Sequence, residues 1–244
     1  RSLLRTALIH GCKIVRLSSL GILPFNFLCT RARAPKKYRI LKSIALSCLI
    51  YQCISYAPTP CGSNSSTYQL TMYAIGYDSG SSSVKADLVE AKTGKVLARV
   101  TAPDNEINIE APEAGWAEQN PEDWYKYVVA ATQDILARTQ VQSVDIKAVG
   151  IGYQMHGLVL VDAENKVVRP SIIWCDGRAV ETGDRAFKGI GLDTCLAHCL
   201  NSPGNFTAAK LKWVADNEPE NYAKTKYAML PGDYIALRLT GEAT

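Results

Sequence analysis

The stretch YAIGYDSGSSSVKA, residues 73–86, joins two apolar segments through a polar turn that is longer than a simple hairpin requires. An apolar run ends at Asp78, a glycine set among four serines follows, and the chain resumes at Val84 and Lys85. The glycine permits a turn that brings backbone N–H groups to one side, and the serine hydroxyls add donors. Converging N–H groups form an anion site, so the stretch predicts a phosphate-binding loop. A polar hairpin made of common turn residues is the alternative.

The segments around this turn predict three strands in succession. Residues 73–78 are apolar, residues 83–90 alternate between apolar and polar side chains, and residues 96–100 follow a tight turn at Gly94. Strands with such short connections pair antiparallel, so we expect a meander.

The pattern then changes to alternating helices and strands. Asn120 is a predicted N-cap, Pro121 takes the first helical position, and the apolar face of this helix continues to about Arg138. The strand at residues 146–152 is reached through that helix, so it should lie parallel to its neighbour. Further strands are predicted at 158–162 and 171–174, and further helices at 178–188, 207–217 and 232–239. This order predicts an α/β domain with a mixed sheet.

Charge is distributed unevenly along the 244 residues. Residues 1–71 contain ten Lys and Arg and no acid, whereas the remainder contains 17 basic and 23 acidic residues. The net charge of +4 therefore hides an acidic body, and nucleic acid is not an expected partner.

Residues 1–71 do not have the pattern of a folded domain. A basic, Ser-containing, acid-free composition is typical of a transit peptide, and residues 44–57 resemble a short interfacial segment. We favour a third interpretation, in which this extension is disordered or non-native and the protein begins at Met72. That interpretation predicts a cytoplasmic protein with no membrane partner, and a native transit segment would predict an organelle instead.

Cysteines of the body give no disulfide framework. Residues 72–244 contain only Cys175, Cys195 and Cys199, which is typical of a reducing compartment. Cys195, His198 and Cys199 lie close in sequence, but no second ligand pair follows at zinc-finger spacing, so a buried helix face is favoured over a metal site.

Five motifs, taken in order along the chain, support the prediction of a phosphate-binding loop. They are GYDSGSSSVK (76–85), GWAEQNPEDWY (115–125), the long stretch from GIGYQMHG to WCDGR (150–178), SPGNFTAAKLKWVADNEPE (202–220) and MLPGDYIALRLTGE (229–242). Their order and spacing resemble the N-terminal half of the FGGY carbohydrate kinases. The resemblance covers residues 72–244 and does not include residues 1–71.

The resemblance implies an actin-like ATPase (ribonuclease H-like) fold in which two related domains close on ATP and Mg²⁺. The chain would hold the sugar domain of that pair, and the second domain would be absent. The implied reaction is ATP-dependent phosphorylation of a sugar hydroxyl. The motifs QMHG and LPGDYIALRLTGE match the branch acting on D-xylulose, and ribulose, gluconate or glycerol are the alternative substrates. A homodimer is the assembly expected if the chain self-associates.

The resemblance also assigns roles to the loop at residues 78–85. Gly80, Ser81, Ser82 and Lys85 would face the phosphates of ATP, and Asp78 would hold Mg²⁺ directly or through water. The family usually has Asp-x-Gly-Thr followed by Ser or Thr, whereas this chain has Ser79 after the aspartate and Ser81 in place of the threonine. Both changes keep hydroxyls or reduce bulk.

The sugar-site residues that the resemblance implies come from three later motifs. Asp233 would be the catalytic base, and its alternative is a carboxylate that caps a helix. Met155 and His156 would contact the ketose. Further candidates for substrate binding are Gln154, Trp174, Asp176 and Asn205; Asp176 could instead pair with Arg178.

Overall fold

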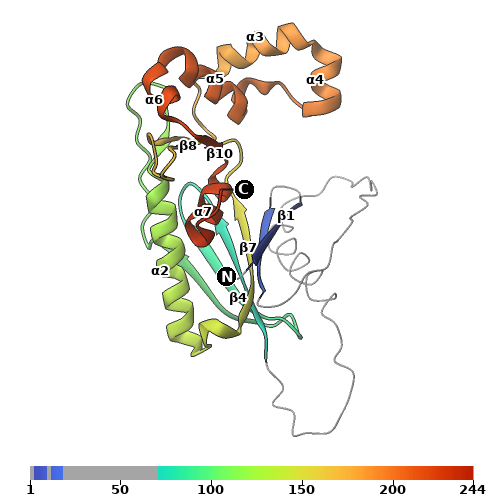
Figure 1. Cartoon of the computed structure of the whole chain (residues 1–244), viewed down its shortest axis with the longest axis vertical. Coiled ribbons are helices and arrows are strands. Elements are labelled where there is room, and N and C mark those ends of the chain that lie inside the picture. Colours follow the sequence, from blue (N-terminus) through green and yellow to red (C-terminus); the bar gives the residue numbers. More distant parts are fainter. Residues whose placement is uncertain (1–2, 10–11, 19–70, 244) are drawn as a thin grey trace, which may run out of the picture.

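The computed structural model describes residues 3–9, 12–18 and 71–243 (Figure 1). Its strands are β1 (Leu3–Ile9), β2 (Cys12–Ser18), β3 (Tyr73–Ser79), β4 (Val84–Glu90), β5 (Val96–Ala102), β6 (Glu118–Gln119), β7 (Ile146–Tyr153), β8 (Val159–Val161), β9 (Ser171–Ile172) and β10 (Tyr227–Met229). Its α-helices are α2 (Pro121–Thr139), α3 (Val180–Ile190), α4 (Leu192–Cys199), α5 (Thr207–Asn217), α6 (Pro219–Lys224) and α7 (Pro231–Thr240), with 3₁₀ turns η1 (Ser143–Asp145) and η2 (Pro203–Asn205).

The main sheet has the strand order β1–β2–β7–β3–β4–β5. Strands β3, β4 and β5 pair antiparallel, which confirms the predicted meander, and β7 runs parallel to β3 as expected for a strand reached through α2. Strands β1 and β2 belong to residues 1–71, the segment whose composition differs from that of the rest of the chain. Most of this segment lies outside the described residues, so the prediction made for it stays a prediction.

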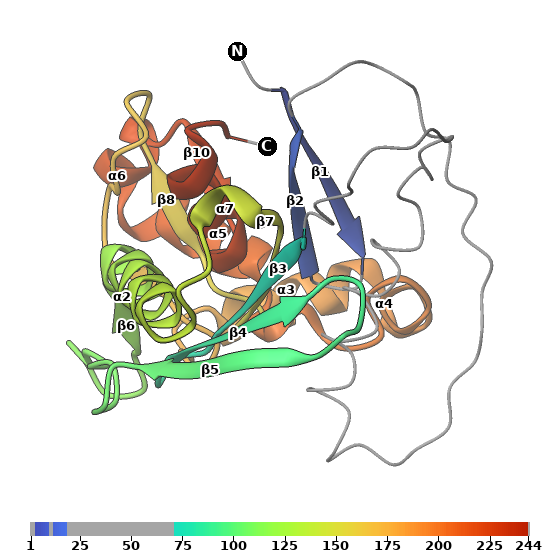
Figure 2. The same cartoon turned by 90° about the horizontal axis from the view of Figure 1, so that it is seen from below.

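Helices α2 and α7 cover one face of this sheet (Figures 1 and 2). Alternation along β3 turns Ile75 and Tyr77 towards the helices, where they join Trp124 and Ile235 in the main core. Asp78 therefore projects towards the opposite face. The N-terminus of α2 is built as predicted, because the Asn120 side chain accepts the N–H of Glu122.

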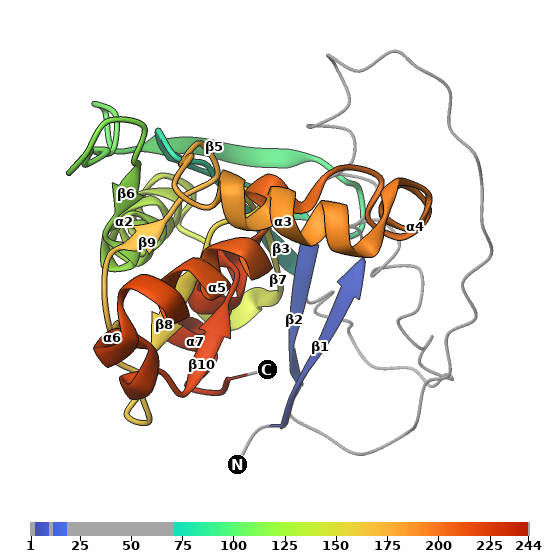
Figure 3. The ribbon, with the colours of Figure 1, turned by 90° about the horizontal axis from the view of Figure 1, so that it is seen from above.

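The predicted strands at 158–162 and 171–174 form, but they leave the main sheet. Strand β8 pairs with β10, and β9 pairs with β6, in two separate two-stranded sheets. Seen from above, α3 and α5 lie over this end of the molecule (Figure 3). Within the described residues, no helix is long and apolar enough to cross a membrane.

Helix α3 packs against η2 through a glycine that has no room for a side chain. A Cβ at Gly183 would lie 2.8 Å from the carbonyl carbon of Pro203 and closer still to Gly204. Such a separation is impossible without moving the backbone of one element, so Gly183 fixes the distance between α3 and η2.

We expect Gly183→Ala to destabilise the protein by about 1 to 3 kcal/mol, although alanine is the better helix former. The matched control is Gly189→Ala in the same helix, where a Cβ meets nothing within 4 Å. That variant should gain about 0.5 kcal/mol because alanine restricts the unfolded chain. Urea unfolding of both variants measures the difference, and equal effects would contradict the close-contact explanation.

Candidate active site

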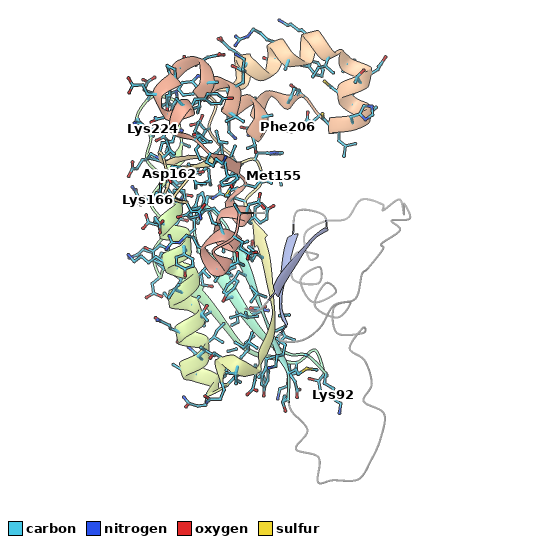
Figure 4. All side chains as sticks on the ribbon, viewed as in Figure 1. Lys92, Met155, Asp162, Lys166, Phe206 and Lys224 are labelled. Carbon is cyan, nitrogen blue, oxygen red and sulfur yellow. The ribbon has the colours of Figure 1, made fainter. Side chains whose placement is uncertain are left out.

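The carboxyl ends of β3 and β7 meet at one edge of the sheet. Ser79 pairs with Tyr153 at the ends of these parallel strands, and the Gln154 N–H donates to the Ser79 carbonyl at 2.9 Å. The turn at residues 80–83 and the loop at residues 154–157 therefore emerge side by side. Figure 4 places Met155 towards the end of the main sheet opposite Lys92, which lies in the turn between β4 and β5. Ligands of open α/β sheets bind at such carboxyl edges.

The turn at residues 80–83, the serine turn, is held by one internal hydrogen bond and by hydrogen bonds from two other parts of the chain. The Gly80 N–H donates to the Ser83 carbonyl at 3.0 Å, which closes the turn, and the Ile107 N–H donates to the Ser82 carbonyl at 2.8 Å. The Gln119 side chain donates to the Ser81 carbonyl at 2.7 Å. These bonds fix the turn before any ligand arrives.

Asp78 on β3 and Lys85 on β4 are directly paired neighbours on adjacent strands. Their charged atoms are 4.0 Å apart, and 47% of the Asp78 side chain and 59% of the Lys85 side chain are exposed. The parallel neighbour of Asp78 is Gly152, which has no side chain to crowd the carboxylate. Both charges therefore remain available to a ligand.

The loop at residues 154–157 presents different chemistry along its length. Met155 is 65% exposed, whereas Gln154 is nearly buried. His156 adopts φ of +62°, which is uncommon for a residue with a side chain, and its ring stacks on Phe206 at a centroid distance of 4.8 Å. Burial and the nearby Lys210 charge lower the pKa of His156, so its imidazole is neutral at pH 7.

Trp174 connects the turn at residues 80–83 to η2. Its indole N–H donates to the Ser81 hydroxyl at 3.3 Å, its side chain is exposed, and its carbonyl accepts the Asn205 amide. An exposed indole beside the turn provides a flat apolar surface on which a sugar face can lie.

Three polar atoms at this edge are buried and find no hydrogen-bond partner among the described residues. They are Ser79 Oγ, Gln154 Oε1 and Asn205 Oδ1. Native proteins leave few buried polar atoms unpaired, and these three are covered by protein, so a ligand would reach them only through a shift of the surrounding loops.

Asp176 belongs to a buried ion-pair network. Its carboxylate accepts the Ala117 N–H at 2.6 Å and pairs with Arg178 at 2.7 Å, and both side chains are almost fully buried. Arg178 also stacks over Trp116 at 3.7 Å and pairs with Glu118 at 2.7 Å. The structure therefore shows the Arg178 pairing that the sequence offered as the alternative, and the substrate-binding role of Asp176 stays a prediction.

Asp233 lies in the first turn of α7, beside the same loop. Its carboxylate accepts the Leu230 N–H at 3.1 Å, which is the helix-capping arrangement. A Cβ at Gly157 would lie 2.5 Å from Pro231 Cγ, and one at Gly232 would lie 2.7 Å from Tyr153 Cγ. Close packing thus brings this turn to the sheet edge. The observed contact is a cap, and the role of catalytic base stays a prediction.

Sequence reasoning missed two residues of this region, Gln119 and Lys210. Gln119 precedes the N-cap of α2 and also accepts the Trp124 indole N–H at 3.1 Å. Lys210 is completely buried on α5, one turn before the buried Val214. A lysine on the apolar side of a predicted helix was the available signal.

The carboxylate of Asp78 and the hydroxyls of the turn at residues 80–83 are suited to bind phosphate together with Mg²⁺. Among the described residues no group of three or more His, Cys, Asp or Glu could hold a metal ion by itself. Mg²⁺ in phosphoryl-transfer sites commonly uses one or two carboxylates, water and the phosphates, and Asp78 beside the serine turn fits that arrangement.

Comparison with known proteins decides the family. The sequence model of the N-terminal domain of the FGGY family of carbohydrate kinases matches residues 73–244. The chain belongs to the FGGY family of carbohydrate kinases. It is 38% identical over 168 residues to the xylulose kinase of Escherichia coli strain K12, and 37% identical over 172 residues to that of Bacillus subtilis strain 168. Each alignment covers 69% of this chain and 33% of the relative, so this FGGY chain spans about a third of those relatives' length.

Solved FGGY structures have the same architecture. A xyloylose kinase from Brucella ovis matches with a TM-score of 0.63 at 35% identity, over 70% of this chain and 34% of its own. A xylulose kinase from Rhodospirillum rubrum matches with a TM-score of 0.62 at 26% identity, over 70% and 35%. The mixed sheet and its helices are therefore the N-terminal part of the actin-like ATPase fold of these kinases.

Proposed function

We propose that this chain is the sugar-binding part of an ATP-dependent kinase that phosphorylates the terminal hydroxyl of D-xylulose, giving D-xylulose 5-phosphate. The observation that carries the proposal is the shared sheet edge, where the serine turn after β3 and the loop after β7 lie side by side and Trp174 bonds to Ser81. The names of the similar relatives support xylulose as the sugar.

The sugar would lie between the loop at residues 154–157 and Trp174. Met155 supplies an exposed apolar wall, and Trp174 supplies a platform for the sugar face. A neutral His156 can both donate to and accept from sugar hydroxyls, which a charged imidazolium cannot. Gln154 Oε1 is buried and unpaired, and it would accept one further hydroxyl only if the loop shifts when the sugar binds.

The phosphate end of the substrates would lie at the turn. ATP with Mg²⁺ supplies the transferable phosphoryl group and neutralises its charge when bound. Asp78 would hold the metal directly or through water, and Lys85 and the hydroxyls of Ser81 and Ser82 would contact phosphate oxygens. Gly80 would allow the backbone to turn beneath them.

The transfer also needs a group that accepts the proton of the sugar hydroxyl. The family resemblance assigns this role to Asp233, whereas the observed bond assigns it the cap of α7. Asp233→Asn separates the two roles, because an amide oxygen still caps the helix but does not accept a proton as a base.

Sugar binding without phosphorylation is the second candidate for the 244-residue chain by itself. It is favoured by the coverage, since the aligned xylulose kinases are about three times longer than the matched region. Transfer requires groups on both sides of the phosphate, and the described residues supply one side.

Calorimetric titration of the chain with D-xylulose, D-ribulose, gluconate and glycerol tests the sugar site. We expect D-xylulose to bind most tightly, and His156→Ala to weaken its binding about tenfold or more because a hydrogen bond to the sugar is lost. Lys212→Met, an exposed change on α5, is the control. Tighter binding of D-ribulose would reject the xylulose assignment, and no binding of any of the four would reject the sugar site.

A further inference from the structure

The loop at residues 154–157 contains a residue in an unfavourable backbone conformation. His156 has φ of +62°, and a residue with a side chain holds that conformation only when its surroundings fix it. Its neighbour Gly157 lies tightly against Pro231, so the loop cannot shift towards α7. What fixes the other side of the loop determines where the side chains of Met155 and His156 point.

Lys210 occupies that other side. The side chain is completely buried, and Nζ donates to the carbonyls of His156 at 2.8 Å and Asn205 at 3.1 Å. Two neighbours in the same segment act on the same loop: Thr207 Oγ1 donates to the Gly157 carbonyl at 3.2 Å, and Phe206 stacks on the His156 ring.

We infer that Lys210 is a positioning residue of the sugar site, which holds the His156 carbonyl and thereby presents Met155 and His156 to the sugar. The inference rests on the proposed function, because it assigns Lys210 to the sugar site of that kinase. Lys210 is buried and acts through the loop, so it does not itself touch the sugar. Sugar binding should therefore depend on a lysine that lies beneath the site.

The protonation of Lys210 is compatible with this role. Burial lowers its pKa to about 8, although the nearby Asp176 and Cys175 raise it and Arg178 lowers it. An amine has two N–H donors even when it is neutral, and the carbonyls of His156 and Asn205 need two. Both bonds therefore survive on either side of pH 8, whereas the positive charge that lowers the pKa of His156 is lost above it.

The test compares Lys210→Met with Lys212→Met in the 244-residue chain. Lys212 lies on the same helix and is 62% exposed. We expect Lys210→Met to weaken D-xylulose binding about tenfold to a hundredfold, because the two carbonyls lose their donors and the loop loses its orientation. NMR titration should show the His156 pKa rising towards its ordinary value in Lys210→Met, and Lys212→Met should change neither quantity.

A pH series of unfolding gives an independent measurement. The unfolded chain binds the Lys210 proton more tightly than the folded one does, so Lys210 should contribute a rise in wild-type stability between about pH 8 and pH 10. Lys210→Met should lack that rise. Lys210→Gln, which keeps two N–H donors without the charge, should recover part of the sugar affinity while the His156 pKa stays raised, and it replaces Lys210→Met if the latter does not fold.

Binding by Lys210→Met within twofold of wild type, with an unchanged His156 pKa, would overturn the inference. Failure of the proposed function looks different, because the wild-type chain would then bind none of the sugars. In that case the His156 pKa and the pH series still test whether Lys210 holds the loop.

Discussion

Asp176→Asn should lower the free energy of unfolding by about 3 to 5 kcal/mol, the largest stability effect we expect of a single charge-removing substitution. Arg178 is 1% exposed, and the substitution would remove one of its two carboxylate partners, leaving Glu118, which Arg169 also contacts. Removing one partner from a buried ion-pair network costs far more than the intact pair contributes, because the remaining charge loses compensation where water cannot replace it. For a domain of this size the midpoint of thermal unfolding should fall by about 10 °C.

A matched exposed pair provides the control. Asp87 and Arg99 form an equally good bidentate contact, with both bonds at 2.7 Å, but Arg99 is 59% exposed. Asp87→Asn should therefore cost less than about 1 kcal/mol. Urea unfolding of both variants gives the comparison, and similar losses would show that burial does not determine the strength of these pairs.

The second large effect is expected at the serine turn. In the protein extended to the full length of the family, Asp78→Asn should lower kcat for ATP-dependent phosphorylation about a hundredfold to a thousandfold, the range for loss of one preorganised electrostatic group. Binding of D-xylulose should change little, because the sugar contacts come from the loop at residues 154–157. A large fall in kcat with a constant sugar affinity is the signature of a phosphate-side residue.

Asp87→Asn is again the control, because alternation places Asp87 on the same face of the sheet and opposite Gly76, two residue pairs further from the turn than Asp78. It should keep nearly full activity. Loss of sugar affinity in Asp78→Asn, or equal activity of the two variants, would contradict the assignment of Asp78 to the phosphate side.

The elements predicted best are those whose signals are local. The meander follows from alternation and short turns, and α2 begins where Asn120 and Pro121 predict. The parallel pairing of β3 and β7 follows from the intervening helix. Neighbouring residues determine each of these features, so the sequence pattern contains them.

The features that sequence reasoning did not resolve depend on distant partners. Short strands such as β8 and β9 pair with β10 and β6 instead of the main sheet, and no local pattern specifies that choice. The sequence around Asp176 is equally compatible with a sugar ligand and with a partner of Arg178. Only the structure, in which both side chains are buried and paired, shows that the pair with Arg178 forms. The position of Lys210 on the apolar side of a predicted helix signals an unusual lysine, but its partner, the His156 carbonyl, is specified only when α5 packs against the loop after β7.

The claim that this chain is part of a xylulose kinase is tested most directly by an assay of ATP-dependent phosphorylation. The assay uses the protein extended to the full length of the family, with D-xylulose, D-ribulose, gluconate and glycerol as substrates. We predict phosphorylation of D-xylulose with the highest kcat/KM of the four. Preferred phosphorylation of D-ribulose, or no transfer from ATP to any of the four, would contradict the account.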